Sequence, residues 1–583
     1  MICRVRFAAG VAVLAAICSS KAADAAEEAP QPVEVARATA IPQCTVFVDA
    51  ASRGGDGSAD RPHATIGAAV RAAPAGSIIC VAEGRYAEQI APGAKNFSLA
   101  GGFQSGQRFR VRDSARFVSR AVGKGGSFLR IADEAPGKGK LTSIDGFDIS
   151  GYSQAVVRDY WESQRFDLTN NFIHDNTCAG ENLAGAGFSL ANVSGTIRGN
   201  VIRNNSCARG GAGFLNDAVN ENTVVVESNW IDANHGTSSD SHGGGFYLFG
   251  NTLRIAGNLF SGNTVTQWGG GLFVGAFAPG NQPTNAKLSR NVYRANRAGT
   301  SGGGFFCDDG AACTAEYELY DGNCGGNILV DGGASGSGPT VSRFDHVTIV
   351  NALSPGCKSP GIGFLMDTYQ AVAPDNHVIS NAIFWGNGAG QDIAANCGSG
   401  CAQLKLRVER SMVQTKYGDG TIRVVFGEGI VTPQDPMFVA PARGDYRLRP
   451  GSPVAGVRGS PLGAFAVAAV AEEGRSAPAA SAAPVPAART SGEGPTRRVV
   501  RAPTEPQVQP QPRPEPEGAV RNEPVSRAAG NPARDASLSP KEAFDFAKEL
   551  NTTQGWNAFL KHYPEGFLAG LARAYVKQLD QRQ

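Results

Sequence analysis

Two adjacent acidic residues are the strongest candidates for acid–base chemistry in this sequence. Asp308 and Asp309 form the only Asp-Asp pair in the repeated part of the chain, between Cys307 and Cys313. Two carboxylates held close together shift each other's titration, as the acid and base of a glycoside hydrolase require. We expect the pair at the end of a strand, where it would be catalytic if it faced inward. The alternative, which we favour, is that both are solvated residues of a small disulfide loop.

A second set of side chains has the chemistry of a binding site. Arg209, His242 and Trp268 come just before three successive glycine-rich motifs, so we expect them along one edge of successive structural units. Such a ladder of cations and aromatic rings could hold an extended glycan, although a single exposed tryptophan is also normal on a surface. A metal site formed by His235, Asp240 and His242 is a further alternative. We favour ordinary polar turn residues there and expect no metal.

A repeat of asparagine pairs must position these side chains. Asn171, Asn200, Asn229 and Asn258 are each 29 residues apart, and each is followed five residues later by a second Asn. A fifth line starts at Asn291. Apolar residues recur at fixed positions around them, and short strands broken by Asn and Gly indicate stacked coils with one continuous core. Asn tolerates left-handed turns, and stacked Asn columns should bond to one another between coils. The pattern predicts a right-handed parallel β-helix.

A glycine-rich column repeats with a similar period. Small residues run into an apolar one in motifs that start at Gly185, Gly211, Gly243, Gly269, Gly302 and Gly361. Glycine at these positions allows sharp turns and close packing between coils. The alternative of a phosphate-binding loop is poor, because no lysine or helix start follows the glycines. We therefore interpret the motifs as scaffold.

The composition and the first residues indicate an exported protein. The chain has 54 Lys and Arg against 52 Asp and Glu, a net charge of +2, so no nucleic-acid partner is expected. Arg4 and Arg6 precede an apolar run, and we interpret residues 1–25 as a signal peptide and residues 26–43 as a leader segment. No later apolar run is long enough to cross a bilayer as a helix. We expect a periplasmic, cell-surface or extracellular location.

The cysteines support the same compartment. Ten of the 12 cysteines follow the signal peptide, and an even number suits an oxidising environment. Cys178 and Cys207 occupy the same position one period apart, and adjacent coils lie within reach of a disulfide. The other pairs that we consider are Cys44–Cys80, Cys307–Cys313, Cys397–Cys401 and Cys324–Cys357. Zinc is the rival interpretation, but the chain has no Cys-x-x-Cys pair.

Both ends of the repeated region resemble secreted pectin-lyase-like β-helix proteins. The N-terminal likeness lies in Pro62-His-Ala-Thr-Ile66, Gly84-Arg-Tyr86 and Leu99-Ala-Gly-Gly-Phe103, and the C-terminal one in Asp435-Pro-Met-Phe438 and Gly444-Asp-Tyr-Arg-Leu448. The Gly and Asn columns are similar, more loosely, to the repeats of polymorphic outer-membrane adhesins. The resemblance implies a single-stranded β-helix over residues 44–465, which at about 29 residues per coil would have about 14 coils. It says little about activity, because one fold hosts many functions.

The C-terminal part changes character twice. Residues 466–536 are rich in Pro and Ala and predict a disordered, semi-rigid linker. Residues 537–583 return to a helical period, with Trp556, Phe559, Leu560 and Tyr563 on one stripe. This segment resembles a tetratricopeptide-type helical hairpin. It would be either a small cap or a module that binds a protein partner.

Taken together, these features favour a non-catalytic exported β-helix that binds polysaccharide or a cell-envelope partner through Arg209, His242 and Trp268. The alternative is a polysaccharide lyase or glycoside hydrolase with Asp308 and Asp309 as its catalytic acids. We expect no cofactor for the binding protein, whereas a lyase could use calcium.

Overall fold

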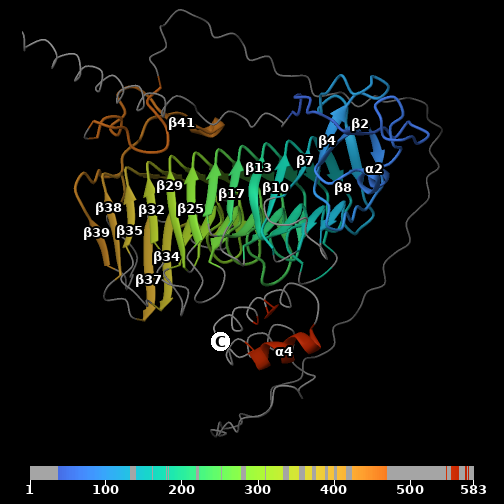
Figure 1. Cartoon of the computed structure of the whole chain (residues 1–583). Helices are drawn as coiled ribbons and strands as arrows, with labels where there is room; N and C mark the ends of the chain where they lie inside the picture. Colours follow the sequence, from blue (N-terminus) through green and yellow to red (C-terminus); the bar gives the residue numbers. More distant parts are fainter. Residues whose placement is uncertain are drawn as a thin grey trace, which may run out of the picture. The chain divides into compact units, whose positions relative to one another are not determined.

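The structure of the chain is a computed structural model in which most residues between 37 and 468 are described (Figure 1). The described residues are 37–131, 140–159, 162–178, 180, 183–217, 222–250, 252–276, 284–308, 310–331, 341–352, 361–370, 376–387, 392–399, 404–414, 423–457, 459–468, 547, 553–563, 572, 573 and 576. The predicted signal peptide lies outside them, whereas residues 37–43 of the predicted leader and residues 466–468 of the predicted linker lie within them. The chain divides into two compact units, one with the stacked strands and the other with the C-terminal helix α4 (Thr553–His562).

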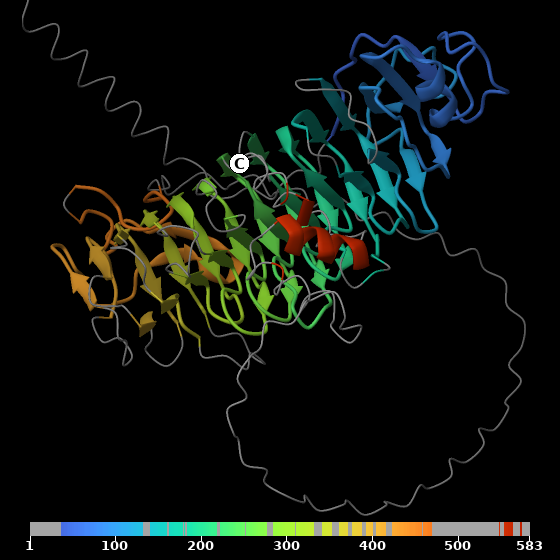
Figure 2. The same cartoon turned by 60° about the horizontal axis from the view of Figure 1, so that its bottom comes forward.

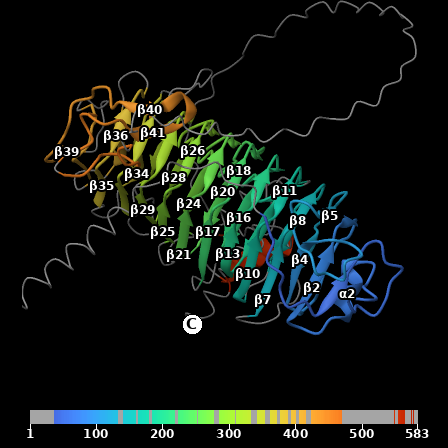
Figure 3. The same cartoon turned by 90° about the horizontal axis from the view of Figure 1, so that it is seen from above.

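The stacked strands form three long parallel sheets, and each turn of the chain visits them in order (Figures 1 and 3). The first sheet consists of β1 (Val46–Val48), β2 (Ser77–Ala82), β4 (Phe97–Phe103), β7 (Leu141–Asp145), β10 (Gln164–Thr169), β13 (Val193–Arg198), β17 (Thr223–Glu227), β21 (Thr252–Ala256), β25 (Thr284–Ser289), β29 (Ala311–Glu316), β32 (Val341–Asp345), β35 (Asn376–Ser380), β38 (Lys405–Glu409) and β39 (Arg423–Phe426). The second consists of β3 (Gly84–Tyr86), β5 (Ser119–Val122), β8 (Phe147–Ser150), β11 (Phe172–His174), β14 (Val201–Arg203), β18 (Trp230–Asp232), β22 (Leu259–Ser261), β26 (Val292–Arg294), β30 (Leu319–Asp321), β33 (Thr348–Val350) and β36 (Ile383–Trp385). The third consists of β6 (Leu129–Ile131), β9 (Val156–Arg158), β12 (Phe188–Ala191), β16 (Gly213–Asn216), β20 (Phe246–Phe249), β24 (Leu272–Gly275), β28 (Phe305–Cys307), β31 (Ile328–Val330), β34 (Phe364–Gln370) and β37 (Ile393–Ser399). A short fourth sheet contains β15 (Ser206–Cys207), β19 (His235–Gly236), β23 (Thr264–Val265) and β27 (Arg297–Ala298).

The predicted parallel β-helix is confirmed, but the number of coils is slightly smaller than predicted. Among the described residues the first sheet has 14 strands, whereas the second has 11 and the third only 10. The estimate of about 14 therefore fits the first sheet and exceeds the number of coils with all three strands. One reason lies in the first coil, where α2 (Ile66–Ala72) replaces further strands between β1 and β2. The side chain of Thr65 caps this helix as predicted, accepting the N–H of Ala68 at 3.2 Å.

The predicted asparagine columns form two continuous ladders of hydrogen bonds. In the first ladder the Nδ2 of Asn200 donates to Oδ1 of Asn229 at 3.0 Å, and Asn229 donates in turn to Asn258 at 2.9 Å. Each ladder Oδ1 also accepts the backbone N–H of the Asn one coil earlier, as Asn229 does from Asn200 at 2.9 Å. The second ladder repeats this pattern from Asn176 through Asn205 and onward. All of these side chains are buried, so the ladders supply partners for polar groups that water cannot reach.

The expectation that the ladder asparagines themselves adopt left-handed turns is wrong. The residues with left-handed backbone are those just before the ladder asparagines, such as Asn170 (φ 53°), Ser228 (φ 55°) and Arg290 (φ 55°). The ladder asparagines themselves are absent from this conformation among the described residues. Asparagine is therefore needed at the ladder positions for its side-chain amide and not for its tolerance of positive φ.

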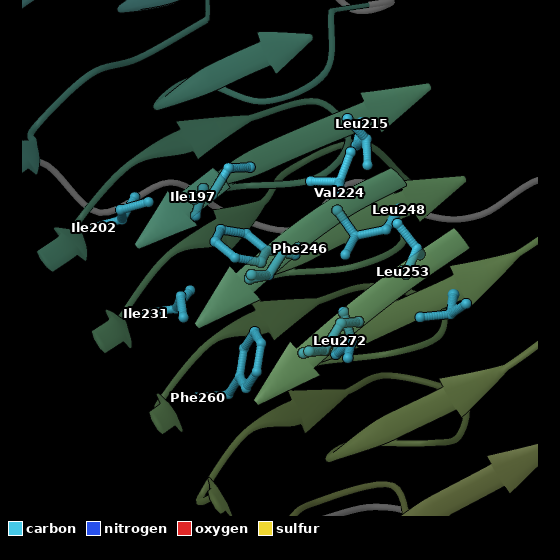
Figure 4. Close-up of a cluster of buried hydrophobic side chains, with 14 of the residues drawn as sticks. Ile197, Ile202, Leu215, Val224, Ile231, Phe246, Leu248, Leu253, Phe260 and Leu272 are labelled. Atoms are coloured by element: carbon cyan, nitrogen blue, oxygen red, sulfur yellow. The ribbon is translucent and has the colours of Figure 1, made fainter. Parts of the chain in front are cut away.

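Apolar side chains from all three sheets fill the interior. Figure 4 shows Ile231 and Phe260 of the second sheet directed into the same interior as Phe246 and Leu272 of the third. All four side chains are fully buried. Full burial of such side chains stabilises a fold by roughly 1.5–3 kcal/mol each, so the stacked interior supplies most of the stability of the β-helix.

The glycine motifs line the third sheet, with one change of phase. Phe188, Phe246 and Leu272 occupy equivalent inward positions, but the residue between the first two is Gly213 and not Phe214. A Cβ on Gly213 would lie 2.2 Å from the ring of Phe188, so that ring fills the space of the missing side chain. The motif at Gly211 is thus displaced by one residue, and Phe214 points to the outer face of the sheet.

Three of the predicted disulfides are present. Cys178 and Cys207 are bonded across adjacent coils with a Cα separation of 4.7 Å, and Cys44–Cys80 and Cys307–Cys313 are also formed. Cys324 is disulfide-bonded as well, whereas its predicted partner Cys357 lies outside the described residues. Cys401 also lies outside them, so the Cys397–Cys401 pair stays a prediction.

The last part of the β-helix folds back as a cover over the second sheet. It contains β40 (Phe438–Ala440), the 3-10 helix η3 (Pro441–Arg443) and β41 (Asp445–Leu448), and the two strands pair antiparallel. We call residues 431–468 the exit segment. Its side chains Phe438, Tyr446 and Leu448 bury the outward residues Val292 and Leu319 of the second sheet.

The helix α4 carries part of the predicted apolar stripe. Trp556 and Phe559 are buried, and the rings of Phe559 and Tyr563 lie 5.2 Å apart. Figure 2 shows α4 in red. The hairpin resemblance stays a prediction, because most of the flanking residues lie outside the described ranges. In the described part of the chain, no helix has the length and apolarity to span a bilayer.

The first asparagine ladder ends on a buried acid. Glu318 occupies the position after Asn291, and its Oε1 accepts both the backbone N–H of Asn291 at 3.1 Å and Nδ2 at 2.8 Å. The hydroxyl of Tyr320 donates to Oε2 at 3.2 Å. Burial raises the pKa of Glu318 from its ordinary value of 4.5 to about 8, against the lowering effect of these hydrogen bonds. The carboxyl is therefore largely protonated in the folded chain at neutral pH.

This buried acid predicts a loss of stability toward alkaline pH. The folded chain keeps a proton that the unfolded chain releases above pH 4.5, so stability should fall as the pH rises from 4.5 to about 8. Glu318→Gln should flatten this decline and raise the thermal midpoint at pH 8, because glutamine keeps an acceptor without a charge. The measurement is thermal unfolding followed by circular dichroism between pH 5 and pH 9. Glu316→Gln, at an exposed position of β29, is the control, and equal pH slopes in both variants would contradict a raised pKa at Glu318.

Candidate functional site

The outer face of the third sheet carries a column of aromatic side chains. Phe214, Tyr247, Phe273 and Phe306 occupy matching outward positions on successive strands. Two of the neighbouring pairs meet edge to face, with centroids 4.7 Å apart for Tyr247 and Phe273 and 5.0 Å apart for Phe273 and Phe306, whereas Phe214 and Tyr247 are tilted at 42°. We call these four residues the outer aromatic column. Although they point away from the interior, each is buried, so they act as packing and not as an open platform.

The three predicted binding residues lie on successive coils at one edge of this sheet. Parallel bridges join His242 to Trp268 and Trp268 to Ser301, and Arg209 bridges to Ala184. The backbone N–H of Gly210 donates to the carbonyl of His242 at 2.9 Å, which places Arg209 directly beside His242 in the column. The structure thus brings Arg209, His242 and Trp268 together in the predicted order.

Asp240 lies between the guanidinium group of Arg209 and the imidazole of His242. Arg209 Nη2 lies 2.7 Å from one carboxylate oxygen of Asp240, and His242 Nε2 lies 3.3 Å from the other. The His242 ring is stacked on Trp268 with centroids 5.0 Å apart and planes within 2°. His242 Nδ1 is buried without a hydrogen-bond partner. We call Arg209, Asp240, His242 and Trp268 the polar edge. Their side chains remain partly accessible, with 42% exposure for Asp240 and 19% for Arg209.

The alternative of a metal site is not supported by the positions of its three residues. His235 Nδ1 bonds to Thr264 Oγ1 at 2.7 Å, whereas Asp240 and His242 contact each other. Within the described ranges, no group of three or more His, Cys, Asp and Glu side chains is placed to hold a metal ion. Asp240 therefore pairs with a cation of the protein itself.

The acidic pair is only partly described. Asp308 follows β28 and its N–H donates to the carbonyl of Val274 at 2.8 Å. It begins the loop closed by the Cys307–Cys313 disulfide, as predicted. Asp309 lies outside the described residues. The catalytic role of the pair stays a hypothesis.

Asp308 belongs to a column of acids, and the member of this column that the sequence did not reveal is Asp331. Asp331 donates its N–H to the carbonyl of Cys307 at 3.0 Å, which places it one coil after Asp308. Val330 pairs with Met366, so Asp367 follows in the next coil. Asp308, Asp331 and Asp367 therefore succeed one another along the far end of the third-sheet strands, and we call them the acid column. Asp331 was missed because its coil lacks the regular glycine motif, yet its position three residues after Ile328 matches that of Asp308 after Phe305.

Tyr247 lies within the electrostatic reach of both sets of polar residues. Burial raises the pKa of its hydroxyl well above the usual range, Arg209 opposes this shift, and Asp308 and Asp240 add to it. The hydroxyl consequently stays protonated at any physiological pH. The polar edge and the acid column thus flank one buried tyrosine of the outer aromatic column.

Comparisons with known proteins add little to this geometry. No family model matches the chain, and no curated protein does. A solved structure of XylC in complex with xylose is similar with 10% identity and a TM-score of 0.38, over 67% of this chain and 87% of that one. A mutant DFA-IIIase from Arthrobacter chlorophenolicus A6 is similar with 12% identity and a TM-score of 0.23, over 72% of this chain and 91% of that one. At these scores neither likeness supports an argument about function, which has to rest on the site itself.

The burial of the outer aromatic column predicts a large structural cost for removing one ring. Tyr247→Ala would leave a cavity between His242, Phe249 and Phe273 and should cost about 3–5 kcal/mol. Tyr247→Phe keeps the ring and should cost less than about 1 kcal/mol. Chemical denaturation of both variants tests this expectation. Equal stability of the alanine variant and the unmodified chain would mean that the ring is an exposed surface group.

Proposed function

We propose that the protein is an exported binding protein that holds an extended polysaccharide along the polar edge. The observation that carries the proposal is the preformed arrangement of Arg209, Asp240, His242 and Trp268 on successive coils. The indole of Trp268 is partly exposed and is held in place by the parallel His242 ring. Such a fixed aromatic face can stack on a sugar ring with little loss of side-chain freedom.

The polar groups beside the indole suit the hydroxyls of a glycan. Asp240 offers acceptors and Arg209 offers donors, and their mutual ion pair fixes both in orientation. Neighbouring coils are about 4.8 Å apart, a spacing comparable to the length of one sugar unit in an extended chain. Equivalent positions on successive coils would then contact successive sugar units. The resemblance of both ends of the β-helix to pectin-lyase-like proteins supports the same class of ligand.

The disulfides support the exported location. Cys44–Cys80, Cys178–Cys207 and Cys307–Cys313 would not persist in a reducing cytosol. The periplasm, the cell surface and the extracellular medium all satisfy this chemistry. A cell-envelope polysaccharide would be available in each of them.

Changing Trp268 should weaken glycan retention without unfolding the chain. Trp268→Ala removes the stacking face, and we expect about tenfold weaker binding to a retained polysaccharide. The measurement is affinity electrophoresis or a glycan array with acidic and neutral polysaccharides. Trp230→Ala removes a partly buried indole from the second sheet and is the matched control. A loss of binding in both variants, or in neither, would argue against the polar edge as the site.

The alternative is an enzyme that uses the acid column. Three aspartates on successive coils, Asp308, Asp331 and Asp367, are the observation that favours it. Neighbouring carboxylates can act as an acid and a base when their environments separate their pKa values. A lyase on such a site could use calcium, and a hydrolase would need only the carboxyls.

The enzyme alternative makes a separate prediction for Asp331. If the column is catalytic, Asp331→Asn and Asp308→Asn should each lower turnover by at least about 100-fold, with no change in glycan retention. Unsaturated products and reducing ends should be followed on several polysaccharides, with and without calcium. Asp159→Asn, at the equivalent exposed position five coils before Asp308, is the control. The absence of any product from the unmodified chain, together with retention of a glycan, would leave binding as the function.

A further inference from the structure

The exit segment forms a concave site on a different face of the β-helix from the polar edge. Phe438, Tyr446 and Leu448 pack on the outward residues of the second sheet. Several hydrogen bonds hold the segment in place. Asn351 Nδ2 donates to the Tyr446 hydroxyl at 3.1 Å, and the N–H of Ala464 donates to Thr348 Oγ1 at 2.9 Å. The walls of any cleft between the two elements are therefore fixed by the fold.

Such a cleft lies between β33, β36 and the exit segment. Its volume is about 410 Å³, and its lining includes Asn351, Trp385, Asp435, Met437, Tyr446 and Arg449. Sites for small ligands usually measure about 300–1,000 Å³, so the cleft can hold a single sugar unit. It is distinct from the polar edge, which belongs to the third sheet.

The lining combines an aromatic wall with a rim of opposite charges. The indole of Trp385 is partly exposed, whereas the ring of Tyr446 is buried. Asp435 and Arg449 are both exposed at the rim. Because one acid and one base face the cleft, the site has no net charge. This favours hydroxyl groups, which can donate to Asp435 and accept from Arg449, over an ionised carboxylate, which can only accept.

The backbone around Asp435 is prearranged for this role. Oδ1 of Asp435 accepts the N–H of Met437 at 2.8 Å, and among the described residues Oδ2 makes no hydrogen bond. Met437 has left-handed backbone with φ 57°, a conformation that is costly for a side chain without a hydrogen-bonding group and that tends to persist at functional positions. Arg449 Nη2 donates to the carbonyl of Val439 at 2.8 Å, which orients the remaining guanidinium N–H groups.

We propose that this cleft binds one uncharged pyranose unit, as a chain end or a side branch of a glycan. The sugar ring lies against Trp385, Asp435 accepts hydrogen bonds from its hydroxyls, and Arg449 donates to their oxygens. The inference does not depend on the polar edge, so either site can fail without the other.

Titration of the full chain with monosaccharides tests the proposal. D-galactose, D-glucose, D-xylose and D-galacturonate should be compared by saturation-transfer NMR and calorimetry at millimolar concentrations. At least one of the three neutral sugars should bind more tightly than galacturonate. Asp435→Asn removes the charged acceptor at an exposed position that should not affect folding, and it should weaken binding by at least about tenfold. Trp385→Ala should weaken it similarly.

Two further variants separate this cleft from the polar edge. Trp268→Ala should leave monosaccharide binding unchanged, and Asp159→Asn controls for the loss of a surface charge. The proposal is overturned if no sugar binds, if galacturonate binds best, or if Asp435→Asn binds like the unmodified chain. Loss of monosaccharide binding in Trp268→Ala alone would instead assign the ligand to the polar edge.

Discussion

The structure depends on satisfying the buried polar groups at the turns of each coil. A coil must change direction while its backbone N–H and carbonyl groups are shielded from water, and an unpaired group there costs about 1–3 kcal/mol. The asparagine ladders solve this by serving two coils at once. Asn200, for example, accepts the N–H of Asn171 at 3.0 Å and donates to the carbonyl of Leu168 at 2.8 Å. Each side chain therefore fixes the turn of the neighbouring coil, so that successive coils keep the same strand register.

Because the register is fixed, the equivalent side chains of successive coils form columns on the surface of the β-helix. Because alternate residues of a strand face opposite sides, one residue of displacement exchanges the interior and the exterior. The coil at Gly213 makes this exchange in one sheet only: Phe188 fills the interior space of the glycine, and Phe214 joins the outer aromatic column. The outer column, the polar edge and the acid column are consequences of the same stacking. Their chemistry is set by single residues, but their geometry is set by the ladders.

The repeat made the fold predictable from sequence, whereas the sites were predictable only where the motif continued. The Asn period, the Cys178–Cys207 bond and the alignment of Arg209, His242 and Trp268 all follow from counting residues within a regular coil. Asp331 escaped because its coil has Asn327 in place of the third glycine. The cleft under the exit segment was equally hidden, since Trp385 and Asp435 meet only through tertiary packing of an irregular segment. Neither the role of Asp240 as a partner of Arg209 nor the burial of Tyr247 has a local signature.

The separation of the columns bears on whether the protein cleaves a glycan or holds it. The polar edge lies at the start of the third-sheet strands and the acid column lies at their end, so the length of one strand separates the two. Four residues, as in β20, span about 13 Å. The two carboxyls of a glycosidase flank one bond at about 5–10 Å, so residues from the two columns are too far apart to act on the same bond. A glycan chain stacked on Trp268 would run from coil to coil along the axis of the β-helix. It would therefore lie parallel to the acid column and would not cross it. This arrangement favours retention over cleavage for any glycan bound at the polar edge. It also means that affinity would grow with the number of coils contacted, as expected when many weak contacts act on one rigid scaffold.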